Sequence, residues 1–342
     1  MRSMLCLVLV LQATAQNSAD STTFSADVRV VNLLAVVKDR SGRLRSDLAK
    51  NDFQLMIDGK PQAIDYFARQ TDLPLTLGLL VDTSASMLRV FDAERTASTK
   101  FLKQVLRRPE DRAFLVRFDR DVKLLQPPTS SRKRLQSGLG VLDSQTWFQR
   151  QMEEERQNAT PRGKRASTAL YDAVVQAATR YMKGQNGRKA IILLSDGVDD
   201  GSTSSLSDAI GAALRSDTLV YSIHVFNSEP HAVETRSTLS SSPAISHEEQ
   251  RRKRAVEFGR QVLMRVSQQT GGGFFAMPDA RTTASIFTQI EDELRSQYIL
   301  GFTPAGDGSS PGVHSIMLTT TASGATVQTR ESYFVEAADH SR

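Results

Sequence analysis

The stretch GLLVDTSASM, residues Gly78 to Met87, joins an apolar run to an aspartate and then to three hydroxyl-bearing residues. An uninterrupted apolar run is typical of a strand that is buried on both faces of a parallel sheet. Open α/β sheets bind their ligands at the carboxyl ends of such strands. The stretch therefore predicts a buried strand that ends at a binding site.

A second stretch, AIILLSDGVDD, has the same form, with an apolar run that leads into Asp196. Between the two stretches, Thr168 begins a helical pattern, STALYDAVVQAA. The acidic residues that close the second stretch, Asp199 and Asp200, are interpreted as an exposed acidic turn. If both strands are parallel neighbours, the side chains at their ends meet at one edge of the sheet.

The candidate metal ligands at this edge all supply oxygen atoms; they are Asp82, Ser84, Ser86, Thr168 and Asp196. Oxygen ligands suit a hard divalent cation, so we expect Mg²⁺, with Mn²⁺ or Ca²⁺ as alternatives, and not zinc or copper. With only two carboxylates in the set, a bound divalent cation would not be over-neutralised, and a vacant coordination position could still attract an anionic ligand. The pattern therefore favours a site that grips an Asp or Glu carboxylate of a partner protein.

These residues resemble the von Willebrand factor type A (VWA) domain and its metal-ion-dependent adhesion site. The family motif D-x-S-x-S is matched by Asp82, Ser84 and Ser86, its separate threonine by Thr168, and its second aspartate by Asp196. The resemblance implies that the serines and the threonine touch the metal directly, while the aspartates act largely through water.

The resemblance extends over residues 73–296, and one position departs from it. Family members often place glycines before the threonine, whereas Ala166 and Ser167 stand there in this chain. The segment DFQLMIDGKPQ before this region and ESYF after it resemble an exported bacterial group, the acidobacterial-type VWFA-related domain proteins.

Apolar runs alternate with helical periodicity throughout residues 73–296, which predicts an α/β fold. We expect a doubly wound, mostly parallel six-stranded sheet flanked by helices, interrupted by insertions at 147–164 and 228–246. The expected strands are 75–82, 113–118, 122–125, 189–195, 218–226 and 273–276. The expected helices are 90–106, 132–142, 169–182, 205–215, 248–269 and 282–294.

Two shorter segments, 27–72 and 297–335, have strand character instead. Each is too small to bury a core alone, so we expect them to pack together as an accessory β element beside the α/β domain.

The N-terminus has the features of a secretory signal at residues 1–15, followed by a flexible leader at 16–26. We therefore expect an exported bacterial protein, periplasmic or extracellular. No second apolar run is long enough to span a membrane. The net charge of +5 is too small to indicate nucleic-acid binding.

Three functions fit this pattern, and metal-dependent protein binding fits it best. The chain lacks the G-x-S-x-G elbow of serine hydrolases and the Walker loop of nucleotide hydrolases, so we do not expect an enzyme. The alternatives are a metal-assisted hydrolase and a structural metal site in an envelope scaffold protein.

Overall fold

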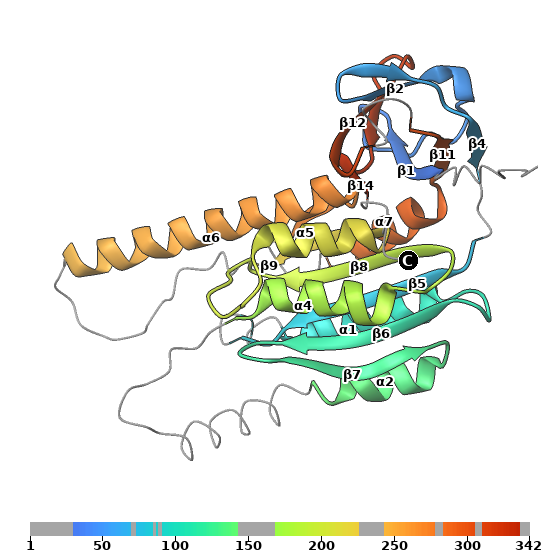
Figure 1. Ribbon diagram of the computed structural model, residues 1–342. Coiled ribbons are helices and arrows are strands. Elements are labelled where there is room, and N and C mark those ends of the chain that lie inside the picture. The colour runs from blue at the N-terminus through green and yellow to red at the C-terminus, as the bar shows by residue number, and fades with distance from the viewer. Residues whose placement is uncertain are drawn as a thin grey trace, which may run out of the picture.

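A computed structural model of the 342-residue chain describes the following residues: 30–69, 73–84, 87, 91–142, 168–225, 243–277, 283–304 and 310–335. They form an α/β domain and a smaller β sandwich next to it (Figure 1). The signal and leader at 1–26, Ser86 and the insertion at 147–164 lie outside this part of the chain.

A six-stranded sheet forms the centre of the α/β domain, in the order β10-β9-β8-β5-β6-β7. The strands are β5 (Leu75–Asp82), β6 (Arg112–Phe118), β7 (Val122–Thr129), β8 (Arg188–Ser195), β9 (Thr218–Val225) and β10 (Phe274–Met277). All neighbours are parallel except β6 and β7, which are joined by a tight turn and pair antiparallel. This arrangement confirms the predicted fold class.

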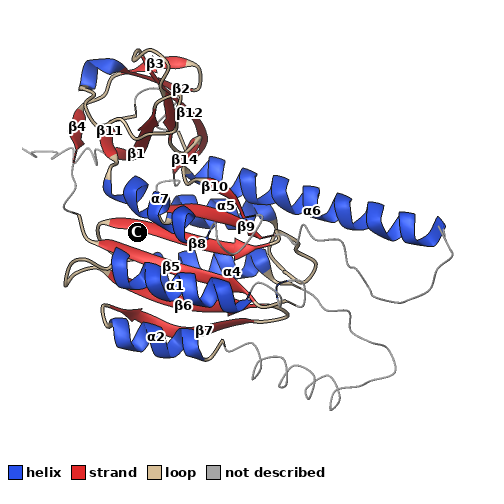
Figure 2. Ribbon diagram, turned by 180° about the vertical axis from the view of Figure 1, so that it is seen from behind, coloured by secondary structure: helices blue, strands red, loops and turns tan. Residues whose placement is uncertain are grey.

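Helices cover both faces of this sheet. In Figure 2 one face carries α1 (Phe91–Val105), α2 (Arg132–Gly140) and α7 (Thr283–Arg295). The other face carries α4 (Leu170–Gln176), its π-helical continuation η3 (Ala177–Met182), α5 (Leu206–Arg215) and α6 (Pro243–Thr270). None of the helices in the described ranges is long and apolar enough to cross a bilayer.

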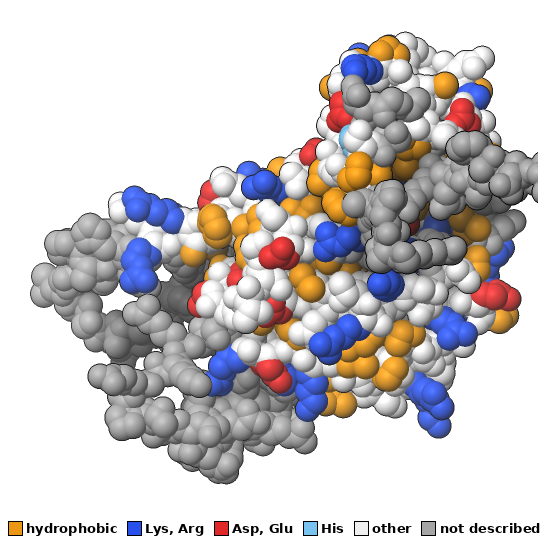
Figure 3. All heavy atoms as spheres, in the orientation of Figure 1, with side chains coloured by type: hydrophobic (Ala, Val, Ile, Leu, Met, Phe, Trp, Pro, Cys, Tyr) orange, Lys and Arg blue, Asp and Glu red, His pale blue; other side chains and the backbone are white. Residues whose placement is uncertain are grey.

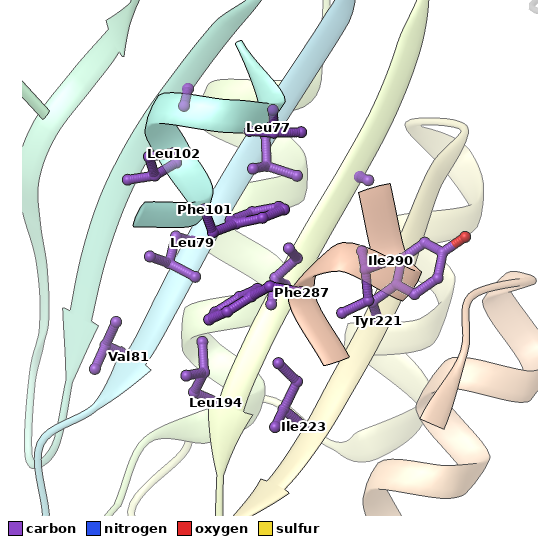
Figure 4. Close-up of a cluster of buried hydrophobic side chains, with 14 of the residues drawn as sticks. Leu77, Leu79, Val81, Phe101, Leu102, Leu194, Tyr221, Ile223, Phe287 and Ile290 are labelled. Atoms are coloured by element: carbon purple, nitrogen blue, oxygen red, sulfur yellow. The ribbon is translucent and has the colours of Figure 1, made fainter. Parts of the chain in front are cut away.

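The central strand β5 is buried along its whole length, which explains its uninterrupted apolar sequence. Leu77, Leu79 and Val81 face α1 and α7, where the rings of Phe101 and Phe287 stack with centroids 4.4 Å apart (Figure 4). The alternate side chains face the opposite helices. Burial of each Leu or Phe side chain stabilises the fold by about 1.5–3 kcal/mol. Packing on both faces of β5 therefore fixes the position of its carboxyl end.

The β sandwich consists of two four-stranded sheets, β13-β1-β11-β4 and β14-β12-β2-β3. Its N-terminal elements are β1 (Val31–Lys38), the 3₁₀ turn η1 (Lys50–Asp52), β2 (Phe53–Ile57), β3 (Lys60–Gln62) and β4 (Tyr66–Arg69). Its C-terminal strands are β11 (Tyr298–Phe302), β12 (Gly312–Thr320), β13 (Thr326–Gln328) and β14 (Ser332–Val335). Both sheets mix strands from the two ends of the chain, which confirms the predicted accessory β element.

The N-terminal boundary of α6 differs from the prediction. The insertion was expected to extend to residue 246 and the helix to begin at residue 248, but α6 begins at Pro243. Proline is tolerated in the first turn of a helix, where its missing N–H has no intrahelical partner to lose. The Ser/Pro-rich composition of this segment therefore did not indicate where the helix starts.

Candidate metal centre

Asp82 is the last residue of β5 and its side chain is completely buried. Its Oδ2 accepts a 2.6 Å hydrogen bond from the hydroxyl of Ser195, the last residue of β8. Its Oδ1 accepts a 2.9 Å hydrogen bond from the backbone N–H of Ser84. The carboxylate is thus fixed by its own loop and by the neighbouring strand.

The charge on Asp82 is poorly compensated by these contacts. Burial, followed by repulsion from Asp196, raises the pKa of Asp82 to about 7, although the hydrogen bonds from Ser195 and Ser84 lower it. A cation beside two carboxylates has the opposite effect, because it favours their ionised forms. The pair of carboxylates therefore fits a site for a hard divalent cation.

Asp196 lies in the turn that follows β8. Hydrogen bonds from backbone N–H groups to side-chain oxygens shape this turn. Its Oδ1 accepts a 3.0 Å hydrogen bond from the N–H of Val198, while the hydroxyl of Ser195 accepts one from the N–H of Gly197. Gly197 has φ of +80°, which only glycine adopts without strain.

Helix α6 passes directly against this turn through Gly259. A Cβ atom at Gly259 would lie 2.0 Å from the carbonyl oxygen of Asp196, and one at Gly197 would lie 2.3 Å from the carbonyl oxygen of Gly259. Both glycines are therefore required for the close approach of helix and turn. The sequence did not indicate a role for Gly259, because the contact depends on how a distant helix packs.

Thr168 is held next to the same turn by its backbone. Its N–H donates a 2.7 Å hydrogen bond to Oδ1 of Asp200, and its carbonyl accepts hydrogen bonds from the N–H groups of Asp200 and Gly201 at 3.2 and 3.0 Å. Asp199 accepts a 3.0 Å hydrogen bond from the N–H of Tyr171. The two acidic residues thus do more than form an exposed turn: they satisfy backbone donors at the start of α4.

Asp119, which follows β6, connects the loop after β5 with the loop that precedes α4. Its Oδ2 accepts a hydrogen bond from the hydroxyl of Thr83 at 3.2 Å, and its backbone carbonyl accepts one from the N–H of Ala169 at 2.7 Å. Its other carboxylate oxygen, Oδ1, accepts a 2.9 Å hydrogen bond from Arg117. The sequence missed Asp119, although a polar residue directly after a buried strand was the signal that identified Asp82.

The structure therefore joins the loops that carry Asp82, Ser84, Thr168 and Asp196 into one hydrogen-bonded network at the carboxyl edge of the sheet. Ser86 lies outside the described residues. Within the residues that the structure describes, no three His, Cys, Asp or Glu side chains gather as a metal site. The candidate ligand set is instead two carboxylates with hydroxyl groups.

A parallel sheet covered by helices on both faces, with oxygen-rich loops at its carboxyl edge, defines a doubly wound α/β domain. Residues 77–198 match the family model of the von Willebrand factor type A domain. The match begins in β5 and ends just after the Asp196 turn, so it contains all five candidate ligands. The chain therefore contains a VWA domain, as its sequence predicts.

Solved structures with related folds have low sequence identity to this chain. A VWA protein from Catenulispora acidiphila is 11% identical, with 92% of this chain and 76% of that chain covered and a TM-score of 0.45. BatB from Bacteroides thetaiotaomicron is 17% identical, with 65% and 100% covered and a TM-score of 0.44. Proximal thread matrix protein 1 from the mussel byssus, solved with a zinc-occupied MIDAS motif, is 12% identical, with 66% and 49% covered and a TM-score of 0.42. A comparison with curated proteins gave no match.

Proposed function

We propose that this chain is an exported VWA-domain protein that binds a partner protein through a divalent cation and has no catalytic activity. The cation, Mg²⁺ or else Mn²⁺ or Ca²⁺, would be held by the oxygen atoms of Asp82, Ser84, Ser86, Thr168 and Asp196. An Asp or Glu carboxylate of the partner would complete its coordination.

One observation carries this proposal: the carboxylate of Asp82 is buried, and it is close enough to Asp196 for the two carboxylates to repel each other. A buried carboxylate is costly unless its charge is compensated, and a second carboxylate nearby increases the cost. Neutral hydrogen-bond donors from Ser195 and Ser84 compensate it only in part. A bound cation would offset the remaining cost.

The same residues favour binding over catalysis. Two carboxylates do not give the site an excess of negative charge over a divalent cation, so an external carboxylate can still bind at a vacant coordination position. Carboxylates beside a cation remain ionised and are poor proton donors, so Asp82 and Asp196 are unsuited to general acid catalysis.

A pull-down from an exported protein fraction tests the proposal. The purified chain is used as bait in parallel with Mg²⁺ and with EDTA, and bound proteins are identified by mass spectrometry. We expect partners that are captured only with Mg²⁺ and are lost with the variant Asp196→Asn. Asp292→Asn, which alters an exposed carboxylate on α7, is the matched control and should retain them. Capture that is unchanged by EDTA would contradict the proposal.

A further inference from the structure

Lys38 of β1, Gln328 of β13 and Glu293 of α7 meet where the β sandwich contacts the α/β domain. Helix α7 lies beside the sandwich in both Figure 1 and Figure 2. The amine nitrogen of Lys38 lies 3.0 Å from Oε1 of Gln328 and 2.7 Å from Oε1 of Glu293. The amide nitrogen of Gln328 donates a 3.3 Å hydrogen bond to Oε2 of Glu293. The two oxygens of one carboxylate thus contact two different nitrogen atoms.

The ion pair in this cluster is withdrawn from bulk water. The side chain of Glu293 is completely buried, and that of Lys38 is 19% exposed. In contrast, basic and acidic side chains are interspersed on the outer face shown in Figure 3, where water screens them. Withdrawal from water disfavours charged groups relative to neutral ones, which favours transfer of a proton within the pair. The neutral amine formed by that transfer is a nucleophile.

Neighbouring groups hold the three side chains in place. The amide of Gln289, one turn earlier on α7, donates a 3.1 Å hydrogen bond to Oε1 of Glu293. The amide nitrogen of Gln328 also donates to the carbonyl oxygen of Gly271, at 3.4 Å. Because a C=O bond is about 1.23 Å long, the amine nitrogen of Lys38 lies within about 4.2 Å of the amide carbon of Gln328. Reacting atoms approach to about 3–3.5 Å, so a shift of about 1 Å is sufficient.

We propose that Lys38 and Gln328 become joined by an isopeptide bond, with Glu293 as the residue that moves the protons. Glu293 takes one proton from the ammonium group of Lys38, and the lone pair freed on Nζ forms a bond to Cδ of Gln328. Glu293 then gives the proton to Nε2, the Cδ–Nε2 bond breaks, and ammonia leaves. The second proton that Nζ loses converts ammonia to ammonium, so Glu293 ends as a carboxylate and no oxidant or cofactor is consumed.

The bond joins residues that are 290 positions apart in the chain. The chain has one cysteine, Cys6, so it cannot form a disulfide within itself. A link across so long a loop restricts the unfolded chain as a disulfide would. Because Glu293 belongs to the α/β domain, the bond forms only after the sandwich and this domain have folded together.

This self-modification occurs once per chain and turns over no external substrate. It does not depend on the function proposed for the metal centre. Before the bond forms, Lys38 and Glu293 are the ion pair that the structure shows, and stability measurements on that pair refer to freshly refolded, unlinked chain.

Tryptic peptide mapping of the folded full chain by tandem mass spectrometry tests the proposal. Trypsin does not cleave after a lysine whose amine is acylated. We therefore expect a branched peptide that joins residues 30–40 to residues 296–330 and is lighter by one ammonia than the two peptides together. Its fragment spectrum places the bond between Lys38 and Gln328, which distinguishes it from loss of ammonia elsewhere in the chain. Recovery of only the separate peptides 30–38 and 296–330, after incubation of the folded chain, would overturn the proposal.

Variants of α7 test the role of Glu293. Glu293→Gln keeps the amine and the amide but carries no proton, so its peptides should remain unlinked. Asp292→Asn alters the exposed carboxylate of the next residue and should link as the wild type does. Glu293→Asp keeps the charge but draws the carboxylate back, so it should link at least about tenfold more slowly. Circular dichroism verifies the fold of each variant. If Glu293→Gln, or Glu293→Asp where Glu293→Gln does not fold, links as fast as the wild type, the proposal fails.

Discussion

The hydroxyl of Ser195 at the end of β8 donates a 2.6 Å hydrogen bond to the carboxylate of Asp82 at the end of β5, 113 residues earlier in the chain. The bond joins the two strands whose sequences suggested a common site. It also lies within a buried region, where a directed hydrogen bond orients a carboxylate more effectively than it would in water.

The first prediction concerns the unpaired charge of Asp82 when no metal is bound. Its pKa is raised to about 7 in the folded chain, against about 3.9 in an unfolded one. Protonation of Asp82 therefore stabilises the fold at pH values below the pKa of Asp82 in the unfolded chain. This stabilisation is lost as the pH rises through the pKa of Asp82 in the folded chain. In EDTA, the free energy of unfolding from urea titrations should increase as the pH falls from 8 to 5.

The variant Asp82→Asn is the control for this pH dependence. Asparagine is neutral at both pH values and keeps an oxygen that can accept from Ser195, so the variant should be less dependent on pH between 5 and 8. If Asp82→Asn and the wild type show the same pH dependence in EDTA, another group is responsible.

The second prediction concerns the contact between α6 and the Asp196 turn. Gly259→Ala places a Cβ atom 2.0 Å from the carbonyl oxygen of Asp196, so the helix or the turn must move. We expect the free energy of unfolding to fall by about 1–3 kcal/mol and Mg²⁺ affinity to fall with it. Differential scanning calorimetry and metal titration measure the two effects.

Gly140→Ala is the matched substitution for Gly259→Ala. Gly140 is exposed in α2, and a Cβ atom there would meet nothing within 4 Å. This variant should be more stable by about 0.4–1 kcal/mol, because alanine restricts the unfolded chain. A similar loss of stability in both variants would show that close packing against Asp196 is not the cause.

The third prediction concerns His314, which stacks on Tyr333 in the sandwich. Burial disfavours its charged form, but its hydrogen bonds with Asp58 and with the carbonyl of Ser310, both 2.8 Å long, outweigh this effect and raise its pKa above 6.5. The pair stabilises the fold below that pH and loses this contribution as the pH rises through the raised value. His314→Gln should therefore cost more stability at pH 5.5 than at pH 8.5 in urea titrations. An equal cost at both pH values would refute the assignment.

The fourth prediction concerns the ion pair between Lys38 of the sandwich and Glu293 of α7. Glu293 is completely buried, so Lys38→Met removes its cationic partner and leaves a buried charge with hydrogen bonds from the neutral amides of Gln289 and Gln328. We expect a loss of about 3–5 kcal/mol in the free energy of unfolding. The double variant Lys38→Met/Glu293→Leu removes both charges and should recover most of this loss. A double variant less stable than Lys38→Met would contradict this account.

The sequence predicted the α/β fold because its strands are buried on both faces. A strand such as β5 has no polar face, so its boundaries coincide with the ends of its apolar run. The sandwich was harder to predict in detail. Strands β2 and β12 alternate between buried and more exposed residues, but the pairing of β1 with β11 and β13 joins opposite ends of the chain and has no local signal.

Four of the candidate ligands, Asp82, Ser84, Ser86 and Asp196, were predicted for a similar reason: they lie at the ends of the most recognisable strands. The residues that position them were not found, because Ser195, Asp119 and Gly259 act through contacts between distant segments. A local pattern can indicate where a strand ends, but it does not indicate which helix packs against that end.

The central claim is that loops following β5 and β8 and the loop preceding α4 hold one cation together. Isothermal titration calorimetry with Mg²⁺ tests it most directly, on the wild type, Asp196→Asn and Thr168→Val. We predict one Mg²⁺ bound per wild-type chain and an affinity at least about tenfold lower for each variant, since each removes an oxygen from a different loop. Mg²⁺ binding that is absent in the wild type, or equally tight in all three proteins, would contradict the account.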